Sequence, residues 1–194
     1  MIWIPLAGYL LGSIPFAFLV ARRMAHVDVR VIGSGNVGAA NVLRSANTPA
    51  AVTVVLLDLA KGSTAVWLAG QLGANEPLRA ATGLAAVIGH VYPVWLRFRG
   101  GKGVAVSAGA FGVLAPAATA IALGIFTLVV WATRYVSLGS LMAALALPPL
   151  AEATRAPVEI TYAAAAAAAI VVFRHRTNLR RLINRTERRL GEHA

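Results

Sequence analysis

Residues 90–109, HVYPVWLRFRGGKGVAVSAG, combine the residue types best suited to holding a phosphate group. Glycines surround a lone lysine in this stretch, at Gly100, Gly101 and Gly103 around Lys102. Backbone N–H groups without neighbouring side chains can converge on an anion, and the small-residue run that follows predicts a helix whose N-terminus favours phosphate. The stretch therefore predicts an anion-binding loop. An ordinary positively charged loop between membrane helices is the alternative.

A second glycine-rich segment, GSGNVGAANVLR at residues 33–44, offers neutral hydrogen-bonding groups. It matches G-x-G-x-x-G, but dinucleotide binding requires a strand–helix–strand unit in a soluble sheet, and no such unit fits between the apolar segments of this chain. The loop still supplies a hydroxyl from Ser34 and amides from Asn36 and Asn41. Arg44 adds a bidentate donor suited to phosphate. A simple polar turn remains the other interpretation.

Asp58 and Lys61 stand three residues apart within an apolar segment, so they share a helix face and can form an ion pair. Ionisable groups are costly inside a membrane and commonly mark a functional site that faces the bundle interior. A structural ion pair between helices is the alternative. Gly62 would let another helix or a ligand come close.

Three polar segments, residues 33–44, 89–103 and 174–181, are predicted to face the same side of the membrane, and their histidines are His90 and His175. Each histidine could act as a base, a phosphate donor or a buried structural residue. The sequence has no HExxH, no G-x-S-x-G and no H-x-x-x-x-D motif, which argues against metalloprotease, serine-hydrolase and soluble acyltransferase chemistry. It also has no cysteine, which excludes disulfides and thiol nucleophiles. No metal site is predicted.

The composition indicates a membrane protein, because 58% of the 194 residues are hydrophobic and only 13% are charged. We expect one membrane domain over residues 1–194 and no separate soluble domain. The N-terminal run at residues 2–21 lacks the basic start of a signal peptide and is interpreted as a mature transmembrane helix. The net charge of +11 fits positive-inside topology and anionic lipids better than nucleic acid in so apolar a chain.

The apolar segments predict an all-α polytopic bundle of about seven transmembrane helices. The 30 uncharged residues at 104–133 would form a helix about 45 Å long, against a hydrocarbon core of about 30 Å, so a break near Pro116 is expected. A second break is expected at EATRAPVE, residues 152–159. The alternative is a bundle of five spans, in which the two short helices of residues 104–133 are merged or excluded. The basic tail, residues 174–194, has one apolar face and predicts an interfacial helix, or a solvated tail beyond Ile183.

Positive charge is distributed unevenly between the two predicted sides of the membrane. One side has only Arg79 and Arg155. The other side has Arg22, Arg23, Arg30, Arg44, Arg97, Arg99, Lys102, Arg134 and the arginines from Arg174 to Arg189. The positive-inside rule then places the N-terminus outside and the C-terminus in the cytoplasm.

Three segments together resemble one family: the bacterial membrane acyl-phosphate:glycerol-3-phosphate acyltransferases, or PlsY family. GSGNVGAANVLR, GHVYPVWLRFRGGKGV and FRHRTNLRRL match its three motifs in order and spacing, and DLAKG and RYVSLGS match further positions. The sequence departs from the family pattern at Ala40, Val106 and Thr177, where threonine, threonine and glutamate are usual. Ala40 puts a hydroxyl contact in doubt, whereas the other two positions are expected to be peripheral.

The resemblance implies a reaction in which a fatty acyl group moves from acyl-phosphate to the 1-hydroxyl of glycerol 3-phosphate. The products would be lysophosphatidic acid and phosphate, as in the first acylation step of bacterial phospholipid synthesis. No cofactor, metal or obligate protein partner is implied. The site would lie on the cytoplasmic face of a bacterial cell membrane, in contact with anionic lipids. A transporter for an organic phosphate, or a purely structural membrane protein, would be the competing class.

The resemblance also implies the site residues. Those expected to clamp glycerol 3-phosphate are Ser34, Arg44, Lys102, His175 and Asn178. Those expected to bind substrate elsewhere, including the acyl-phosphate head, are Gly35, Asn36, Gly38, Asn41, Asp58, Lys61, His90, Gly100, Gly101, Gly103, Ser137, Ser140 and Arg174. Catalysis would rest on positioning and on stabilisation of the oxyanion. His175, or the phosphate of glycerol 3-phosphate itself, would accept the proton.

Overall fold

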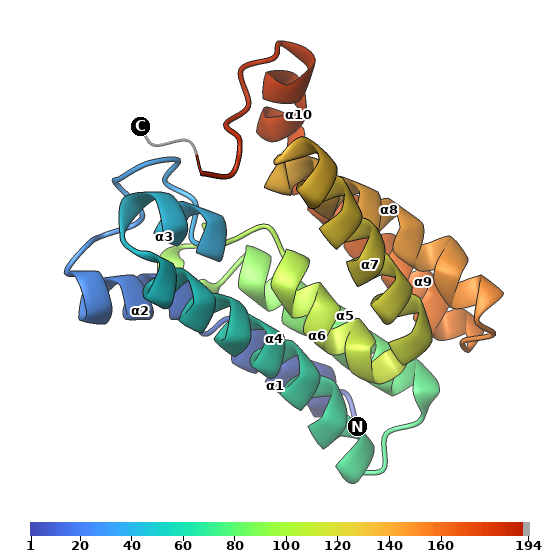
Figure 1. The fold of residues 1–194 in the computed structure, drawn as a ribbon. Helices are drawn as coiled ribbons and strands as arrows, with labels where there is room; N and C mark the ends of the chain where they lie inside the picture. The colour runs from blue at the N-terminus through green and yellow to red at the C-terminus, as the bar shows by residue number, and fades with distance from the viewer. Residues whose placement is uncertain (192–194) are drawn as a thin grey trace.

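Residues 1–191 are described by the structure, a computed structural model in which the regular elements of this range are all helical (Figure 1). This confirms the predicted all-α class. Residues 192–194 of the predicted basic tail lie outside the described range. The helices are α1 (Trp3–Gly12), α2 (Phe16–Ala25), α3 (Ala39–Ser45), α4 (Thr48–Gln71), α5 (Glu76–Val91), the 3₁₀ turn η1 (Val94–Leu96), α6 (Val104–Leu114), α7 (Pro116–Thr133), α8 (Val136–Ala153), α9 (Val158–Arg174) and α10 (Arg176–Ile183).

Prolines divide the long apolar stretches where the sequence predicts breaks. Pro116 begins α7 directly after α6 ends, because proline suits the first turn of a helix but cannot continue one. Pro157 precedes α9, after the turn that ends α8. One further break was not expected: the first apolar run divides into α1 and α2 around Pro15. The tail helix α10 ends at Ile183, where the sequence left two alternatives open.

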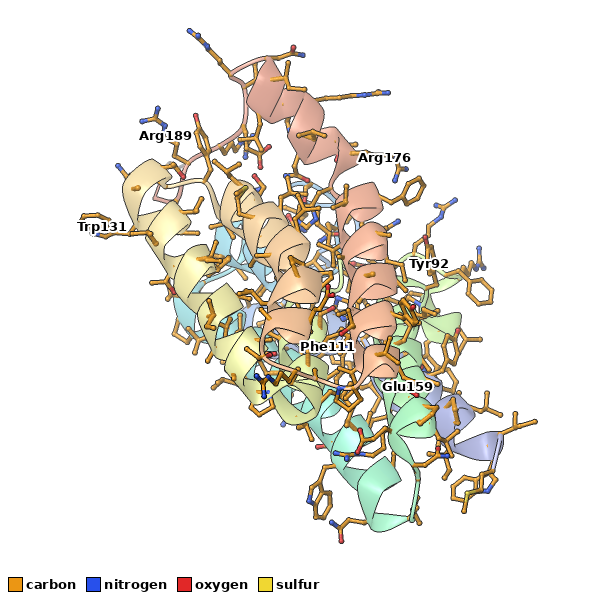
Figure 2. The ribbon with its side chains drawn as sticks, turned by 90° about the vertical axis from the view of Figure 1, so that its right-hand side faces the viewer. Tyr92, Phe111, Trp131, Glu159, Arg176 and Arg189 are labelled. Atoms are coloured by element: carbon orange, nitrogen blue, oxygen red, sulfur yellow. The ribbon has the colours of Figure 1, made fainter. Side chains whose placement is uncertain are left out.

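The helices form two groups, which the chain connects at the turn between α6 and α7 and which also pack together through α5 and α9 (Figure 1). In the first group α4 packs closely on α6, because a Cβ at Gly62 would overlap the backbone of Val106 and one at Gly109 would overlap that of Leu59. Gly62 therefore admits a neighbouring helix, one of the two outcomes predicted for it. In the second group α7, α8 and α9 lie side by side, with Trp131 projecting outward from α7 (Figure 2).

Four helical stretches within residues 1–191 are long and apolar enough to cross a membrane: Trp3–Ala25, Thr48–Gln71, Pro116–Thr133 and Val136–Ala153. The count rises to five if α9 and α10, which meet at an angle of 59°, are taken as one broken span. The helices α5 and α6 are shorter. The number of seven spans and the orientation of the termini stay predictions.

Candidate active site

The three polar segments of the sequence meet at the end of the bundle that carries α10 (Figure 1). They surround a cavity of about 250 Å³, which we call the polar cavity. Arg176 and Arg189 lie toward this end of the molecule, whereas Glu159 lies toward the opposite end (Figure 2). Most predicted site residues line the polar cavity: Asn36, Gly38, Arg44, Asp58, His90, Lys102, Gly103, Ser137, Ser140, His175 and Asn178. The remaining predicted residues lie outside its lining.

Lys102 is held in the polar cavity by a chain of side-chain hydrogen bonds. Its ammonium group donates to Oδ1 of Asn178 at 2.5 Å. The amide of Asn178 in turn donates to Oε1 of Glu187 at 2.6 Å, and Arg181 donates to Oε2 of Glu187 at 2.9 Å. Both Asn178 and Glu187 are buried. The orientation of the Asn178 amide, and through it of the lysine, therefore depends on a carboxylate in the tail.

Glu187 is the functional candidate that the sequence analysis missed. It was treated as part of a uniformly basic tail, yet it is only 7% exposed and lines the polar cavity. The N–H of Leu190 donates to the carbonyl of Arg134, and the Arg134 guanidinium donates to the carbonyl of Leu190, so this part of the tail is held against the turn that joins α7 and α8. A single acid within a run of arginines was the available signal, since a carboxylate there can neutralise cations that would otherwise repel each other.

We expect Glu187→Gln to lower kcat/KM for the acceptor substrate about tenfold or more, because a charge-assisted hydrogen bond contributes about 1.5–3 kcal/mol. The loss should appear mainly in KM, since the change disturbs the positions of Asn178 and Lys102. Glu152→Gln is the matched control, because Glu152 is exposed, lies in the last turn of α8 and is outside the lining of the polar cavity. Steady-state kinetics that are equal for the two variants would remove Glu187 from the site.

Two members of the glycine loop are held by hydrogen bonds within the protein. The N–H of Gly100 donates to the backbone carbonyl of Val91 at 3.1 Å, and the N–H of Gly101 donates to the backbone carbonyl of His90 at 3.1 Å. Both N–H groups thus bond to the end of α5 within the protein, and a contact of Gly100 or Gly101 with an anion stays a prediction. A Cβ on Gly101 would overlap the imidazole of His90, which explains why glycine is needed. Arg174 donates to the carbonyl oxygens of both glycines and braces the loop from α9.

The first glycine segment is shaped by Asn41, which does not line the polar cavity. Its Oδ1 accepts the N–H of Ser34 at 2.9 Å, and its Nδ2 donates to the carbonyls of Val29 and Ile32. The buried amide thus organises the loop, and its direct contact with substrate stays a prediction. Ser34 and Gly35 are exposed and lie outside the cavity lining, so their contact with substrate stays a prediction.

Asp58, Lys61 and His90 form a buried cluster beside the polar cavity. The ammonium of Lys61 lies 2.8 Å from the Asp58 carboxylate and donates to the carbonyl of Ile14 at 2.9 Å. Ile14 belongs to the break between α1 and α2. His90 Nδ1 lies 3.6 Å from the same carboxylate. Asp58 and His90 line the polar cavity, whereas Lys61 borders a smaller neighbouring cavity that these two residues also line, so its contact with substrate stays a prediction.

Burial lowers the pKa values of Lys102 and His175 in the polar cavity. Burial lowers the pKa of Lys102 to about 8, with nearby arginines adding to the effect and Glu187 opposing it. Burial and the Lys102 charge lower the pKa of His175, just beyond α9, to about 4. The imidazole is therefore neutral near pH 7. Its Nδ1 lies 2.8 Å from the Val171 carbonyl, which can only accept, so Nδ1 carries the proton and Nε2 is the acceptor nitrogen.

Comparison with known proteins gives one consistent result. The family model for glycerol-3-phosphate acyltransferase matches residues 2–185. Glycerol-3-phosphate acyltransferases from Syntrophomonas wolfei and Myxococcus xanthus are each 45% identical to this chain, over 96% and 95% of it and over 95% and 96% of their own lengths. The relative from Synechococcus sp. is 43% identical over 95% of this chain and 92% of its own.

Two crystal structures also resemble this chain over 98% of its length and 95% of theirs. Both are of PlsY, an integral membrane glycerol 3-phosphate acyltransferase. The glycerol 3-phosphate form superposes with a TM-score of 0.93 at 35% identity, and the lysophosphatidic acid form with 0.90 at 34% identity. Sequence, fold and the convergence of three polar segments on one cavity agree, and the chain is an integral membrane acyltransferase that belongs to the glycerol-3-phosphate acyltransferase family.

Proposed function

We propose that this protein transfers a fatty acyl group from acyl-phosphate to the 1-hydroxyl of glycerol 3-phosphate. The hydroxyl oxygen of glycerol 3-phosphate forms the new ester bond to the carbonyl carbon, and the bond between that carbon and the bridging phosphate oxygen breaks. The hydroxyl proton passes to a phosphate oxygen, and lysophosphatidic acid and inorganic phosphate leave. The observation that carries the proposal is a cationic cavity at one end of a bundle of apolar helices. Both substrates have an anionic head, and the donor also has a long hydrocarbon chain. The related crystal structures with glycerol 3-phosphate and lysophosphatidic acid support the acceptor and the product.

Arg44 and Lys102 would hold the phosphate of the acceptor, since both line the polar cavity. The planar guanidinium of Arg44 can donate two parallel hydrogen bonds to a phosphate, and the ammonium of Lys102 is a compact positive charge. The donor head would face Asn36, Ser140 and the N-terminus of α6. The first N–H groups of that helix have no partner within the helix and could donate to the donor's phosphate. This arrangement gives the two anionic heads separate donors. Acyl-phosphate is already activated, so positioning and stabilisation of the oxyanion are the main requirements.

The proton of the attacking hydroxyl needs an acceptor. His175 has a pKa of about 4 and is a weak base at neutral pH. The phosphate of glycerol 3-phosphate is a better proton acceptor, because the second pKa of a phosphate monoester is about 6. We therefore assign the proton to the substrate phosphate, with His175 Nε2 orienting the reacting groups.

The donor class is tested by comparing acyl-phosphate, acyl-coenzyme A and acyl carrier protein with the purified protein in detergent, with lysophosphatidic acid measured by mass spectrometry. The proposal expects product from acyl-phosphate alone. Product formation of equal efficiency from a thioester donor would show that the donor assignment is wrong while leaving the acceptor intact.

The pKa of Lys102 predicts a pH dependence for acceptor capture. Its amino group is positively charged below about pH 8 and loses that charge as the pH rises through that value. Because kcat/KM reports the free enzyme, kcat/KM for glycerol 3-phosphate should fall above about pH 8. Arginine stays charged, so residual activity in Lys102→Arg should lack this descending limb. A wild-type profile that stays level to high pH would contradict the assignment.

The whole chain, residues 1–194, would act as one domain in a bacterial cytoplasmic membrane, with the polar cavity at the cytoplasmic face. The uneven distribution of arginine supports this orientation. Helix α10 would lie at the membrane surface, because Leu179 and Ile183 are exposed beside Arg180. The exposed leucine and isoleucine would contact the lipid chains, and the arginines of α10 would contact anionic lipid headgroups.

Topology can be tested cleanly because the chain has no cysteine of its own. Asn75 and Asn184 are exposed and lie in turns on the two predicted sides. In intact cells, Asn75→Cys should react with an impermeant thiol reagent, whereas Asn184→Cys should react only after the membrane is opened. Labelling of Asn184→Cys in intact cells would reverse the orientation.

A further inference from the structure

A second, smaller cavity lies beneath the polar cavity, between α6, α7 and α8. It encloses about 60 Å³, and we call it the lower pocket. The two cavities are continuous in their lining, since both are bordered by Val104, Ala108, Leu123, Phe126 and Ser140. A ligand whose head occupies the polar cavity can therefore extend into the lower pocket without leaving the protein.

The lower pocket suits hydrocarbon and does not suit an anion. Its lining has no charged side chain, and its exposed surface is mostly apolar, although the hydroxyl-bearing residues Ser107 and Thr119 also border it. The hydroxyl of Ser140, which borders both cavities, already donates to the carbonyl of Val136 at 2.8 Å. An apolar cavity of this kind gains free energy when it takes up methylene groups.

Helix α8 fixes the depth of the lower pocket. From Ser140, at the shared border, to Leu147 the helix advances seven residues, which is about 10 Å. Ala143 and Leu147 are four residues apart and share one face of the helix, and both line the pocket. Leu147 is buried in the core, so it closes the far end, while the small side chain of Ala143 leaves the passage open.

We propose that the lower pocket receives the distal part of the donor's acyl chain, and that Ala143 and Leu147 determine which chain lengths are accepted. This inference rests on the proposed function, because it takes a fatty acyl group as the ligand. A longer side chain at position 143 narrows the passage, and a shorter one at position 147 extends it. The two positions therefore change chain-length preference in opposite directions.

The test measures kcat/KM for a series of saturated acyl-phosphates of increasing length, with glycerol 3-phosphate as acceptor. Ala143→Leu should lose about tenfold or more on the longest good donors while keeping its activity on the shortest, because the added carbons displace several methylenes. Leu147→Ala should extend the range toward longer donors. Leu145→Ala is the matched control, since Leu145 is 56% exposed on the same helix, and its profile should match the wild type.

The outcomes separate this inference from the proposed function. If the wild type uses acyl-phosphates but all three variants share its length profile, the lower pocket does not hold the acyl chain. If the wild type uses no acyl-phosphate of any length, the proposed function fails first. Should Ala143→Leu fold poorly, Leu147→Ala decides the question, because a gain on long donors cannot result from damage to the fold.

Discussion

Lys102→Ala should abolish measurable turnover while the protein still inserts and purifies. The lysine lines the polar cavity, and Asn178 holds its ammonium in place through a hydrogen bond. Removal of a charge contact made in the transition state typically costs about 10²–10³ in rate. The measurement is phosphate release from acyl-phosphate in the presence of glycerol 3-phosphate, at matched amounts of folded protein.

Two further variants make this result specific. Lys102→Arg should also be impaired, because a planar guanidinium cannot reproduce the single bond to Asn178 in a space shaped for an ammonium. Arg99→Ala is the matched control, since Arg99 belongs to the same loop but is exposed and lies outside the cavity lining. If Lys102→Ala behaves like Arg99→Ala, the loop is a topological turn and the phosphates bind elsewhere.

Asp58→Asn and Lys61→Met should each destabilise the protein strongly. Their side chains are 4% and 2% exposed and 2.8 Å apart, so either change leaves an uncompensated charge in the interior of the bundle. Breaking a buried ion pair from one side costs about 3–5 kcal/mol, which for a chain of this size corresponds to roughly 10 °C in Tm. Thermal unfolding in detergent measures the effect.

The double variant identifies the cause. With both charges removed, no charge is left buried, and Asp58→Asn with Lys61→Met together should unfold above the poorer single variant. Asp28→Asn is the control, because its partner Arg30 lies at the surface, and Tm should not change. Additive losses in the double variant would mean that each residue has its own separate partner.

The all-helical class and the breaks near Pro116 and Pro157 could be predicted because they depend on local properties, whereas the exact helix ends could not. An uncharged run too long for one span required a break, and Pro116 supplied it. The break at Pro15 was missed because residues 2–21 have the length of a single span, although the proline itself was a local signal for a break. The carbonyl of Ile14 at this break is satisfied by Lys61 from a helix far along the chain.

The site was predictable as a set of segments but not as a set of contacts. Residue type and spacing placed Lys102, Arg44 and His175 in one cavity correctly. Asn41 and Gly101 have the same chemical groups as good ligand donors, yet their hydrogen bonds are made within the protein. Which polar groups remain free depends on tertiary packing, which local sequence does not encode. Glu187 was missed although its partners Asn178 and Arg181 lie in the same tail, because the sequence does not show that the chain turns back onto α10 after Ile183.

The most direct measurement is the stoichiometry of the reaction catalysed by purified protein in detergent micelles, where no compartment exists for transport. Acyl-phosphate and glycerol 3-phosphate are supplied, and phosphate and lysophosphatidic acid are measured together. The proposed function predicts that both products form in equal amounts and only when glycerol 3-phosphate is present. Phosphate release without glycerol 3-phosphate, or no lysophosphatidic acid from folded protein, would contradict it.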